Sequence, residues 1–399
     1  MAHSYRYLII GGGMTADAAV RGIRTVDSEG TIGLVSADHD PPYDRPPLSK
    51  GLWKDMAPDA IWRHTEKHGA VLHLGRAVTS LDLAARVARD EAGDEYRFER
   101  LLFATGGEPR RLPFGGDDVI YFRTAADFRR LHGLASERST FAVIGGGFIG
   151  SEIAAALALH GRQVTMIVPE PAPGARVFPA DLARSVSELY ERHGVRILAG
   201  TTVTGVEARG ESVVIEVRDA ASETRSSVMA DAVVAGLGIR PATQLAEKTG
   251  LAVDNGIVVD EHLVTSEACA FAAGDVAAFP NRHLGVRLRV EHEDAANTMG
   301  ERAGRNMAGD VLPYEHLPFF YSDLFDLGYE AVGELDSRHE MVEDWTEQFR
   351  QGVVYYLNEG RVRGVLLWNV WGQVDAARAL IAEKGPFRPG DVKGRLPAA

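Results

Sequence analysis

Residues 7–16 read Tyr-Leu-Ile-Ile-Gly-Gly-Gly-Met-Thr-Ala, and residues 141–150 read Phe-Ala-Val-Ile-Gly-Gly-Gly-Phe-Ile-Gly. In each stretch a short apolar run, typical of a buried strand, stops at three glycines, and apolar residues then recur with helical spacing. A second apolar run follows, at 31–35 and at 164–168. Strand, glycine turn, helix and strand form the opening βαβ unit of a dinucleotide-binding fold. Because the pattern occurs twice, the sequence predicts two nucleotide-binding domains.

The small residues of these turns have the spacing that a bound pyrophosphate requires. The first permits a tight turn, the second lets backbone amides approach the phosphates, and the third lets the helix pack on the strand. These positions are filled by Gly11, Gly13 and Ala16 in the first unit and by Gly145, Gly147 and Gly150 in the second. A single such turn is weak evidence, but two tight structural turns in the same context would require the same coincidence twice.

The composition restricts the classes of function. The chain has 399 residues, with 43 Lys and Arg against 56 Asp and Glu, and a formal charge of −13. An acidic chain repels phosphate backbones and anionic lipid, so we expect neither nucleic acid nor a membrane as partner. Cys269 is the only cysteine. That count excludes a redox disulfide, a four-cysteine cluster site and a cysteine-rich zinc site, and we expect no metal.

The N-terminal residues, MAHSYRYLIIGGG, show no basic segment followed by an apolar stretch and a small-residue cleavage site. We therefore expect no secretory signal. No apolar run approaches the roughly 18 residues that span a bilayer. These features predict a cytoplasmic protein.

Further strands that end on glycine are expected at residues 101–107, 232–236 and 270–275. The pattern changes near residue 353, where two apolar runs around Asn358-Glu359-Gly360 predict a hairpin, followed by a helix. We predict an α/β fold with two Rossmann-like domains and a C-terminal α+β domain. The expected boundaries are 1–112 with 245–312 for the first dinucleotide-binding domain, 113–244 for the second and 313–399 for the last.

Residues 41–50 read PPYDRPPLSK and contain four prolines within seven residues. Proline in a helix interior removes a hydrogen bond and clashes with the preceding turn, so a helix is excluded here. The residue before each proline is also restricted to extended conformations. We therefore expect a rigid, extended loop.

The motifs together resemble those of flavoprotein reductases with two dinucleotide-binding domains, in which FAD binds the first domain and NAD(P)H the second. The resemblance covers nearly the whole chain and depends on GGGMTA, PPYDRPPLSK, LLFATGG, IGGGFIGSE, GLGIRP and FAAGD. Within that superfamily the chain is most similar to apoptosis-inducing factor and its bacterial relatives, and next to ferredoxin reductases. The closer similarity lies in VEH at 290–292, in the segment from residue 322 that contains SDL and GYEAVG, and in the stretch 352–381.

The resemblance implies that Lys50 lies near the reactive edge of the flavin and pairs with Glu152. A cation there stabilises the anion that forms when the flavin accepts a hydride, and the carboxylate holds the cation in place. Without the motif context, the same residues would be a surface lysine and a glutamate at a helix N-terminus. The residues expected on the FAD side are Gly11, Gly13, Met14, Thr15, Ala16, Asp38, Arg45, Lys50, Val78, Thr105, Gly106, Arg123, Asp275, Glu291, His292 and Tyr321.

The second site is expected to bind NADH. A carboxylate after the second strand of the unit, here Glu170, accepts hydrogen bonds from the adenosine ribose and repels a 2′-phosphate. Arg176 lies close by in sequence and would counter that repulsion, but the balance favours NADH over NADPH. The residues expected on the NADH side are Gly146, Gly147, Phe148, Ile149, Gly150, Glu152, Glu170, Arg176, Gly236 and Glu330.

Two positions depart from the family pattern. Ala37 stands where the family often has a glutamate for the FAD ribose, which leaves Asp38 to bind it. Tyr321 stands where apoptosis-inducing factor has a tryptophan at its nicotinamide site, so stacking on the nicotinamide is expected to be weaker.

Two functions follow from the resemblance. The first is an NADH-dependent FAD enzyme that passes electrons to a separate acceptor, such as a ferredoxin-type iron–sulfur protein, a quinone or another small oxidant. The residues from 313 to 399 hold 14 Asp and Glu against 9 Lys and Arg, which gives no evident basic surface for an acidic ferredoxin. The alternative is a redox sensor, similar to apoptosis-inducing factor, that forms a long-lived complex of reduced FAD with NAD and changes its dimer state. A homodimer is consistent with either function.

Overall fold

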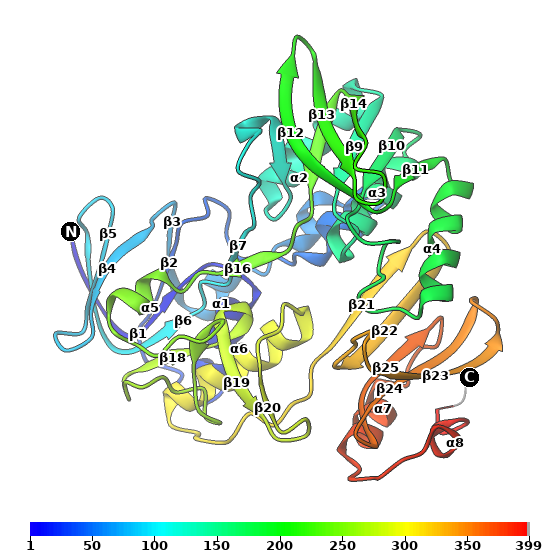
Figure 1. The fold of residues 1–399 in the computed structure, drawn as a ribbon. Helices are drawn as coiled ribbons and strands as arrows, with labels where there is room; N and C mark the ends of the chain where they lie inside the picture. Colours follow the sequence, from blue (N-terminus) through cyan, green and yellow to red (C-terminus); the bar gives the residue numbers. More distant parts are fainter. Residues whose placement is uncertain (397–399) are drawn as a thin grey trace. The chain divides into compact units, whose positions relative to one another are not determined.

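The computed structural model describes residues 1–396. The chain forms two compact units (Figure 1), which we call unit 1 and unit 2. Unit 1 contains residues 1–46, 57–108 and 240–319, and unit 2 contains residues 47–56, 109–239 and the chain from 320 onward. β7 (Gly107–Pro109) and β16 (Ile239–Pro241) lie where the chain passes from one unit to the other. Each unit contains one of the two predicted βαβ patterns.

Unit 1 is built on a seven-stranded sheet with the order β3-β2-β1-β6-β5-β4, in which β18 also pairs with β6. Strands β1, β2, β3, β6 and β18 are parallel, and β4 and β5 pair antiparallel at one edge. β2, β18 and the C-terminal parts of β1 and β6 are buried and largely apolar, because helices and loops cover both faces of such a sheet. The strands are β1 (Ala2–Ile10), β2 (Ile32–Ser36), β3 (Ala70–Leu74), β4 (Val78–Asp82), β5 (Val87–Asp90), β6 (Glu95–Phe103) and β18 (Ala270–Ala272).

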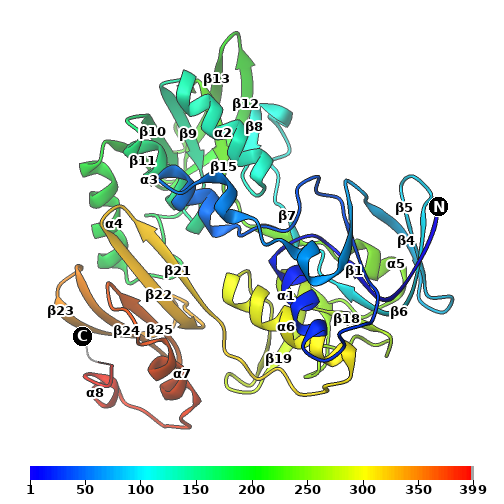
Figure 2. The same cartoon turned by 180° about the vertical axis from the view of Figure 1, so that it is seen from behind.

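Helices α1 (Met14–Arg24) and α6 (Glu293–Ala308) lie side by side in unit 1, as both views show (Figures 1 and 2). Their backbones approach closely because α6 has glycines at the contact. A Cβ atom added at Gly300 would lie 2.4 Å from the carbonyl oxygen of Thr15, and one at Gly304 would lie 2.1 Å from that of Ala19. This packing fixes the first turn of α1, which carries the predicted phosphate-binding residues.

The rest of unit 1 consists of short elements. A three-stranded sheet has the order β17-β19-β20. Its strands, with one further helix, are β17 (Ile257–Val258), β19 (Ala277–Asn281), β20 (Val286–Leu288) and α5 (Gln244–Lys248). Three 3₁₀ turns complete the unit, namely η3 (Pro58–Ile61), η4 (Thr65–His68) and η6 (Gly274–Val276).

Unit 2 contains a second parallel sheet, with the order β11-β10-β9-β15-β8. An antiparallel sheet, β12-β13-β14, shares an apolar core with it, in which Ile215 packs among residues such as Ala142 and Val233. The strands are β8 (Val119–Tyr121), β9 (Thr140–Ile144), β10 (Gln163–Ile167), β11 (Val195–Leu198), β12 (Thr201–Arg209), β13 (Ser212–Asp219), β14 (Arg225–Ala230) and β15 (Ala232–Ala235). The helices are α2 (Ala125–Glu137), α3 (Phe148–Leu159) and α4 (Ala180–Arg192), and a 3₁₀ turn, η5 (Gly116–Asp118), precedes β8.

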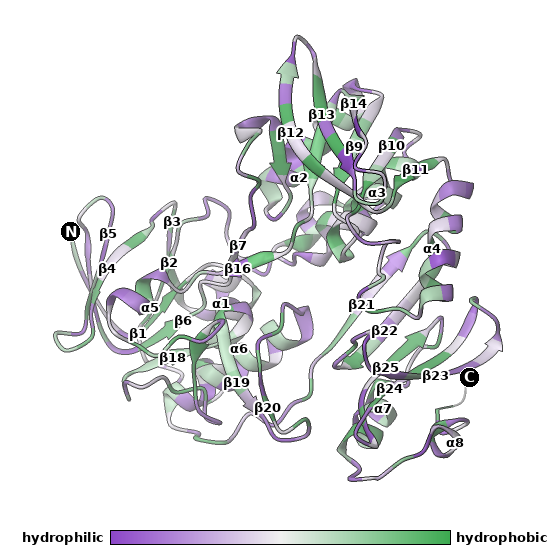
Figure 3. Ribbon diagram, viewed as in Figure 1, coloured by the Kyte–Doolittle hydropathy of each residue, from purple (hydrophilic) through white to green (hydrophobic). Residues whose placement is uncertain are grey.

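The C-terminal part of unit 2 is an antiparallel sheet with the order β21-β22-β25-β24-β23. The predicted hairpin is confirmed as β24 and β25, which are apolar and buried over most of their length (Figure 3). The elements are β21 (Phe319–Leu324), β22 (Leu327–Gly333), β23 (Glu340–Glu347), β24 (Gln351–Asn358), β25 (Arg361–Trp368), α7 (Val374–Ala382) and α8 (Pro389–Val392). The predicted α/β class with an α+β C-terminal part is therefore confirmed. No described helix is long and apolar enough to cross a bilayer.

The proline-rich stretch differs from the prediction of an extended loop. Residues 41–45 form a loop, but Pro46–Ser49 form a short 3₁₀ turn, η1, and a second, η2 (Gly51–Trp53), follows directly after the stretch. The fixed φ of proline, near −65°, is also the φ of a 3₁₀ turn. The prolines that prevent an α-helix interior therefore still permit the 3₁₀ turn η1. The two turns bury Leu48 and Trp53, and the Trp53 indole N–H donates a hydrogen bond to the Leu48 carbonyl at 2.8 Å.

Candidate functional site

The first glycine turn, between β1 and α1, is shaped by two glycines with different roles. Gly11 has φ of +121°, and a Cβ atom there would lie 2.1 Å from the carbonyl oxygen of Ala104, so no other residue fits. Gly13 caps α1, and no described atom lies within 4 Å of an added Cβ. The space beside the N-terminus of α1 is therefore open, and the backbone N–H groups there favour a negatively charged ligand.

Several predicted FAD-side residues of unit 1 lie around this helix N-terminus. Met14, Thr15 and Ala16 form its first turn. Gly274 has φ of +75°, and a Cβ atom there would lie 2.2 Å from the Thr15 hydroxyl oxygen, so the chain passes directly over the turn. Asp275 follows within η6. The structure thus brings together segments that are about 260 residues apart in sequence.

His292 caps the N-terminus of α6 and interacts electrostatically with Asp275 and Asp294. Burial lowers the pKa of His292 to about 4, although both carboxylates oppose this effect. The imidazole is therefore neutral at neutral pH. Neighbouring Glu291 is exposed and accepts a hydrogen bond of 2.9 Å from Arg289.

The remaining FAD-side predictions of unit 1 lie at the ends of strands or in loops. Asp38 follows β2 and accepts a hydrogen bond from the Tyr43 hydroxyl at 3.3 Å. The Arg45 guanidinium stacks on the Tyr43 ring at 5.3 Å. Val78 begins β4, and the Thr105 hydroxyl donates a hydrogen bond to the Ala242 carbonyl at 2.9 Å, with Gly106 next to it. These positions remain predictions of contact with FAD.

The second glycine turn, between β9 and α3, shows the same division of roles. Gly145 has φ of +105°, and its Cβ would lie 2.5 Å from the carbonyl oxygen of Gly236. A Cβ at Gly150 would lie 2.1 Å from the carbonyl oxygen of Gly145. These glycines let strand, helix and β15 pack closely. Gly147, which caps α3, again has no described atom within 4 Å of an added Cβ.

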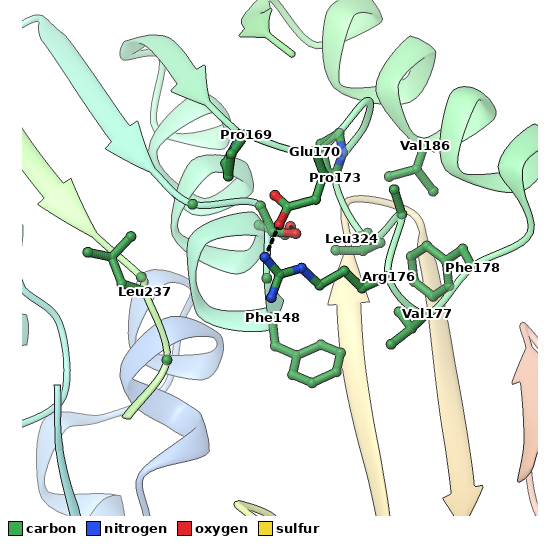
Figure 4. A pocket seen from close by; sticks show the side chains of 18 of the residues that line it. Phe148, Pro169, Glu170, Pro173, Arg176, Val177, Phe178, Val186, Leu237 and Leu324 are labelled. Carbon is green, nitrogen blue, oxygen red and sulfur yellow. Dashed lines mark hydrogen bonds and ion pairs between the residues drawn. The ribbon is translucent and has the colours of Figure 1, made fainter. Parts of the chain in front are cut away.

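A pocket of about 330 Å³ lies beside this turn (Figure 4). Six predicted NADH-side residues line it, namely Gly146, Gly147, Phe148, Glu170, Arg176 and Gly236. Further lining residues were not predicted, among them Ser151, Phe178, Leu237, Leu324 and Tyr329. Leu237 directly follows a predicted strand end. Leu324 and Tyr329 come from the C-terminal sheet and belong to the SDL and GYEAVG motifs, which indicated the family but not a place in this pocket. Ile149, Gly150, Glu152 and Glu330 are not among the lining residues.

Glu170 and Arg176 form an ion pair on the wall of the pocket (Figure 4). The Arg176 side chain is 82% exposed and the Glu170 side chain 21%. Solvent screens the charge of such an exposed cation, whereas the carboxylate is more buried. A carboxylate and a guanidinium therefore both line the part of the pocket that follows β10. In this type of fold the ribose of a dinucleotide binds there.

Lys50 and Glu152 form the predicted pair, with 2.8 Å between Nζ and Oε1. Their side chains are only 14% and 2% exposed, respectively. Lys50 lies in the turn between η1 and η2, and Glu152 lies in the first half of α3. The Lys50 ammonium also lies 5.1 Å from the centre of the Tyr321 ring, on β21. Three separate segments of unit 2 thus meet at one buried cation.

Two serines that donate hydrogen bonds to Glu152 were not predicted. Ser49 donates a hydrogen bond to Oε2 and Ser322 donates one to Oε1, both at 2.6 Å. A serine carries no sequence signal for such a role, although each lies directly beside a predicted residue, Lys50 or Tyr321.

The last two predicted residues of unit 2 lie apart from the ion pair in sequence. The backbone N–H of Arg123 donates to Asp127 at 3.0 Å, just before α2. Glu330 lies on β22, where burial raises the pKa of its carboxyl group and the backbone N–H of Gly372 partly opposes this.

Both turns fit the phosphates of a dinucleotide. Each has an open N-cap glycine at a helix N-terminus, and both helices have small residues in the turn that packs on the neighbouring strand. The donor set is therefore suited to a pyrophosphate in unit 1 and to another in unit 2.

Comparison with known proteins identifies the family. The family model of the pyridine nucleotide-disulphide oxidoreductases matches residues 5–300. The model of the C-terminal domain of mitochondrion-associated apoptosis-inducing factor matches residues 303–346 and 338–383. The predicted resemblance to this superfamily, and within it to apoptosis-inducing factor and ferredoxin reductases, is therefore confirmed.

Individual relatives extend over almost the whole chain. Apoptosis-inducing factor 1 of Dictyostelium discoideum is 32% identical over 95% of this chain and 79% of its own length. The ferredoxin reductase subunit of 5,5′-dehydrodivanillate O-demethylase from a Sphingobium strain is 32% identical over 94% and 93%, respectively. The solved ferredoxin reductase for the CYP199A2 system of Rhodopseudomonas palustris superposes with a TM-score of 0.88, at 25% identity, and covers 99% of this chain and 100% of its own.

The family fixes the class of chemistry. Its members use FAD and NAD(P)H, which fits the two open glycine turns. Because Cys269 is the only cysteine, this chain cannot form the redox disulfide from which the family takes its name. The chain belongs to the pyridine nucleotide-disulphide oxidoreductase family and is a FAD-dependent NAD(P)H oxidoreductase without a redox disulfide.

Proposed function

We propose that this protein oxidises NADH and passes the electrons, through FAD, to a separate ferredoxin-type iron–sulfur protein. The glycine turn of unit 1 would bind the pyrophosphate of FAD, and the pocket of unit 2 would bind NADH. When bound, NADH supplies a hydride and FAD accepts it and releases electrons singly or in pairs. The chain itself supplies binding, orientation and electrostatic stabilisation.

The position of helix α3 carries this proposal. Gly147, Phe148 and Ser151 at its start line the nucleotide pocket, and Glu152 in the same turn holds the Lys50 ammonium. One rigid element thus connects the nucleotide pocket to a buried cation. A fixed positive charge stabilises an anion without reorganisation when the charge develops, which is the usual source of electrostatic catalysis.

The preference for NADH depends on Glu170. Its carboxylate lines the pocket at the position where a ribose hydroxyl is expected, and it would repel a 2′-phosphate. Arg176 opposes that preference, but it is already paired with Glu170 and is largely exposed, so solvent screens its charge. The balance supports NADH.

The acceptor is proposed from the relatives. Two of the relatives described above are ferredoxin reductases, and this chain covers 93% and 100% of their lengths. With one cysteine, the chain lacks a dithiol that could relay electrons to a disulfide substrate. The acidic C-terminal region, with a net charge of −5 from 14 acidic and 9 basic residues at 313–399, predicts that a ferredoxin docks outside it.

A redox sensor is the second candidate, because the C-terminal model of apoptosis-inducing factor matches this chain. Such a protein would be reduced slowly and would hold its nucleotide. Tyr321, which packs on Lys50, would stack on the nicotinamide less strongly than the tryptophan expected in that family, which counts against the sensor.

Steady-state reduction of cytochrome c by NADH tests the proposed function. The purified FAD-loaded protein is assayed with and without an added bacterial [2Fe–2S] ferredoxin, and with NADPH as the control donor. We expect turnover that requires the ferredoxin and is faster with NADH. Turnover that is slow with every ferredoxin and every small oxidant would contradict a reductase and support the sensor.

A further inference from the structure

We propose that Ser322 and Ser49 are positioning residues that hold the Glu152 carboxylate in the orientation that binds Lys50. This inference rests on the proposed role of the Lys50–Glu152 pair in NADH oxidation. It assigns a function to the C-terminal sheet, because Ser322 is a residue of β21.

Each carboxylate oxygen of Glu152 accepts a hydrogen bond from one serine. Ser322 donates to Oε1 and Ser49 donates to Oε2, both at 2.6 Å. Lys50 binds Oε1 at 2.8 Å. Because the two serines come from β21 and from the turn before Lys50, they fix both oxygens of the carboxylate and leave it little freedom to rotate.

Burial makes these hydrogen bonds strong. Ser322 is fully buried, and Ser49 and Glu152 are 5% and 3% exposed. Hydrogen bonds to an ionised group are shorter and stronger than neutral ones, and water cannot replace them at a buried site. A carboxylate accepts all three donors at once, so the arrangement fits ionised Glu152 and a positively charged Lys50.

Ser322 also connects the pair to the nucleotide pocket. Tyr329, on the adjacent strand β22, interacts electrostatically with Glu152 and lines the pocket. Ser322, Glu152 and Lys50 form a bonded series, and Tyr329 lies between this series and the pocket. A role limited to satisfying buried polar groups would not predict an effect on the rate of flavin reduction.

The test compares Ser322→Ala, Ser322→Cys and Ser49→Ala with the wild type, all as FAD-loaded protein. Cysteine has the same shape as serine and is slightly larger, but it donates a hydrogen bond only weakly, so together with Ser322→Ala it separates bonding from packing. Ser187→Ala is the matched control, because the Ser187 hydroxyl bonds within helix α4 to the Ala183 carbonyl. If one variant fails to fold, the other serine still tests the proposal.

Two readouts are measured. The first is the rate constant of flavin reduction at saturating NADH, together with the dissociation constant of NADH. The second is the rate at which acetic anhydride modifies Lys50, measured by mass spectrometry without NADH, with exposed Lys54 as the internal reference. The second readout reports how firmly Lys50 is held and does not depend on activity.

We expect each of the three variants at Ser322 and Ser49 to reduce flavin about tenfold more slowly, with the NADH dissociation constant changed less than about twofold. Modification of Lys50 relative to Lys54 should rise severalfold, and Ser187→Ala should match the wild type. Wild-type values for both readouts in Ser322→Ala and Ser49→Ala would overturn the proposal, as would wild-type behaviour of Ser322→Cys. If NADH fails to reduce even the wild-type flavin, the proposed function is wrong, and Lys50 modification still decides the positioning.

Discussion

Replacing Lys50 with methionine removes the buried cation while keeping most of the side-chain volume. The loss of folding stability is large because Glu152, whose side chain is 2% exposed, would remain as a buried carboxylate without its countercharge. Removing one partner of a buried ion pair typically costs about 3–5 kcal/mol. Two serine donors remain on Glu152, so we expect the lower end, about 3 kcal/mol.

That loss should be visible in thermal unfolding. For a domain of roughly 150–250 residues, each kcal/mol lowers the midpoint by about 2–4 °C, so unit 2 of Lys50→Met should unfold about 6–12 °C lower. Differential scanning calorimetry of the FAD-loaded protein gives the midpoint. Lys54→Met is the control, because Lys54 lies on the same short segment but is exposed.

The same variant should retain FAD and accept hydride more slowly. Removing one group that stabilises developing charge typically slows a reaction by about a hundredfold. Anaerobic stopped-flow mixing with saturating NADH measures the rate of flavin bleaching. If Lys50→Met and Lys54→Met have equal midpoints and equal bleaching rates, Lys50 is not the cation on which the electrostatic argument depends.

Three further predictions use other parts of the site. Gly147→Val should keep the wild-type unfolding midpoint but lose NADH binding in calorimetric titration, whereas Gly150→Val should be destabilised because its Cβ would meet the carbonyl of Gly145 at 2.1 Å; equal effects would be inconsistent with an open N-cap. Glu170→Ala should reduce the preference for NADH over NADPH by about tenfold in steady-state kinetics, and an unchanged ratio would remove Glu170 from nucleotide selection. Because burial lowers the pKa of His292 to about 4, from an ordinary value near 6.5, the unfolded chain binds this proton first; stability should be full above about pH 6.5 and decline toward pH 4. His292→Gln should show a shallower decline of the midpoint over that range, and parallel curves would show that this histidine is not the group responsible.

The fold was predictable because its signals are local and repeated. Each βαβ unit is encoded within about thirty residues, with strand, glycine turn and helix in direct succession. The proline-rich stretch was predicted less well. Its prolines exclude an α-helix interior, but the same fixed φ permits the 3₁₀ turn that forms at Pro46–Ser49.

The candidate site was predictable only where motifs supplied it. Lys50 and Glu152 were paired from their motifs, and the structure brings them to 2.8 Å. Ser322 and Tyr329 belong to the SDL and GYEAVG motifs, but those motifs indicated only the family, because the C-terminal sheet places both residues against residues that are distant in sequence. A serine or tyrosine on a strand is common, so only the assembled structure gives these residues a partner.

An anaerobic titration of the FAD-loaded protein with NADH, followed by admission of air, tests the central claim most directly. The proposed function predicts that one equivalent of NADH bleaches the flavin rapidly, that NADPH does so more slowly, and that the colour returns promptly with oxygen or an added ferredoxin. A flavin spectrum that NADH leaves unchanged would contradict the proposed NADH site in unit 2. Slow bleaching with a persistent long-wavelength band would contradict the reductase and favour the sensor.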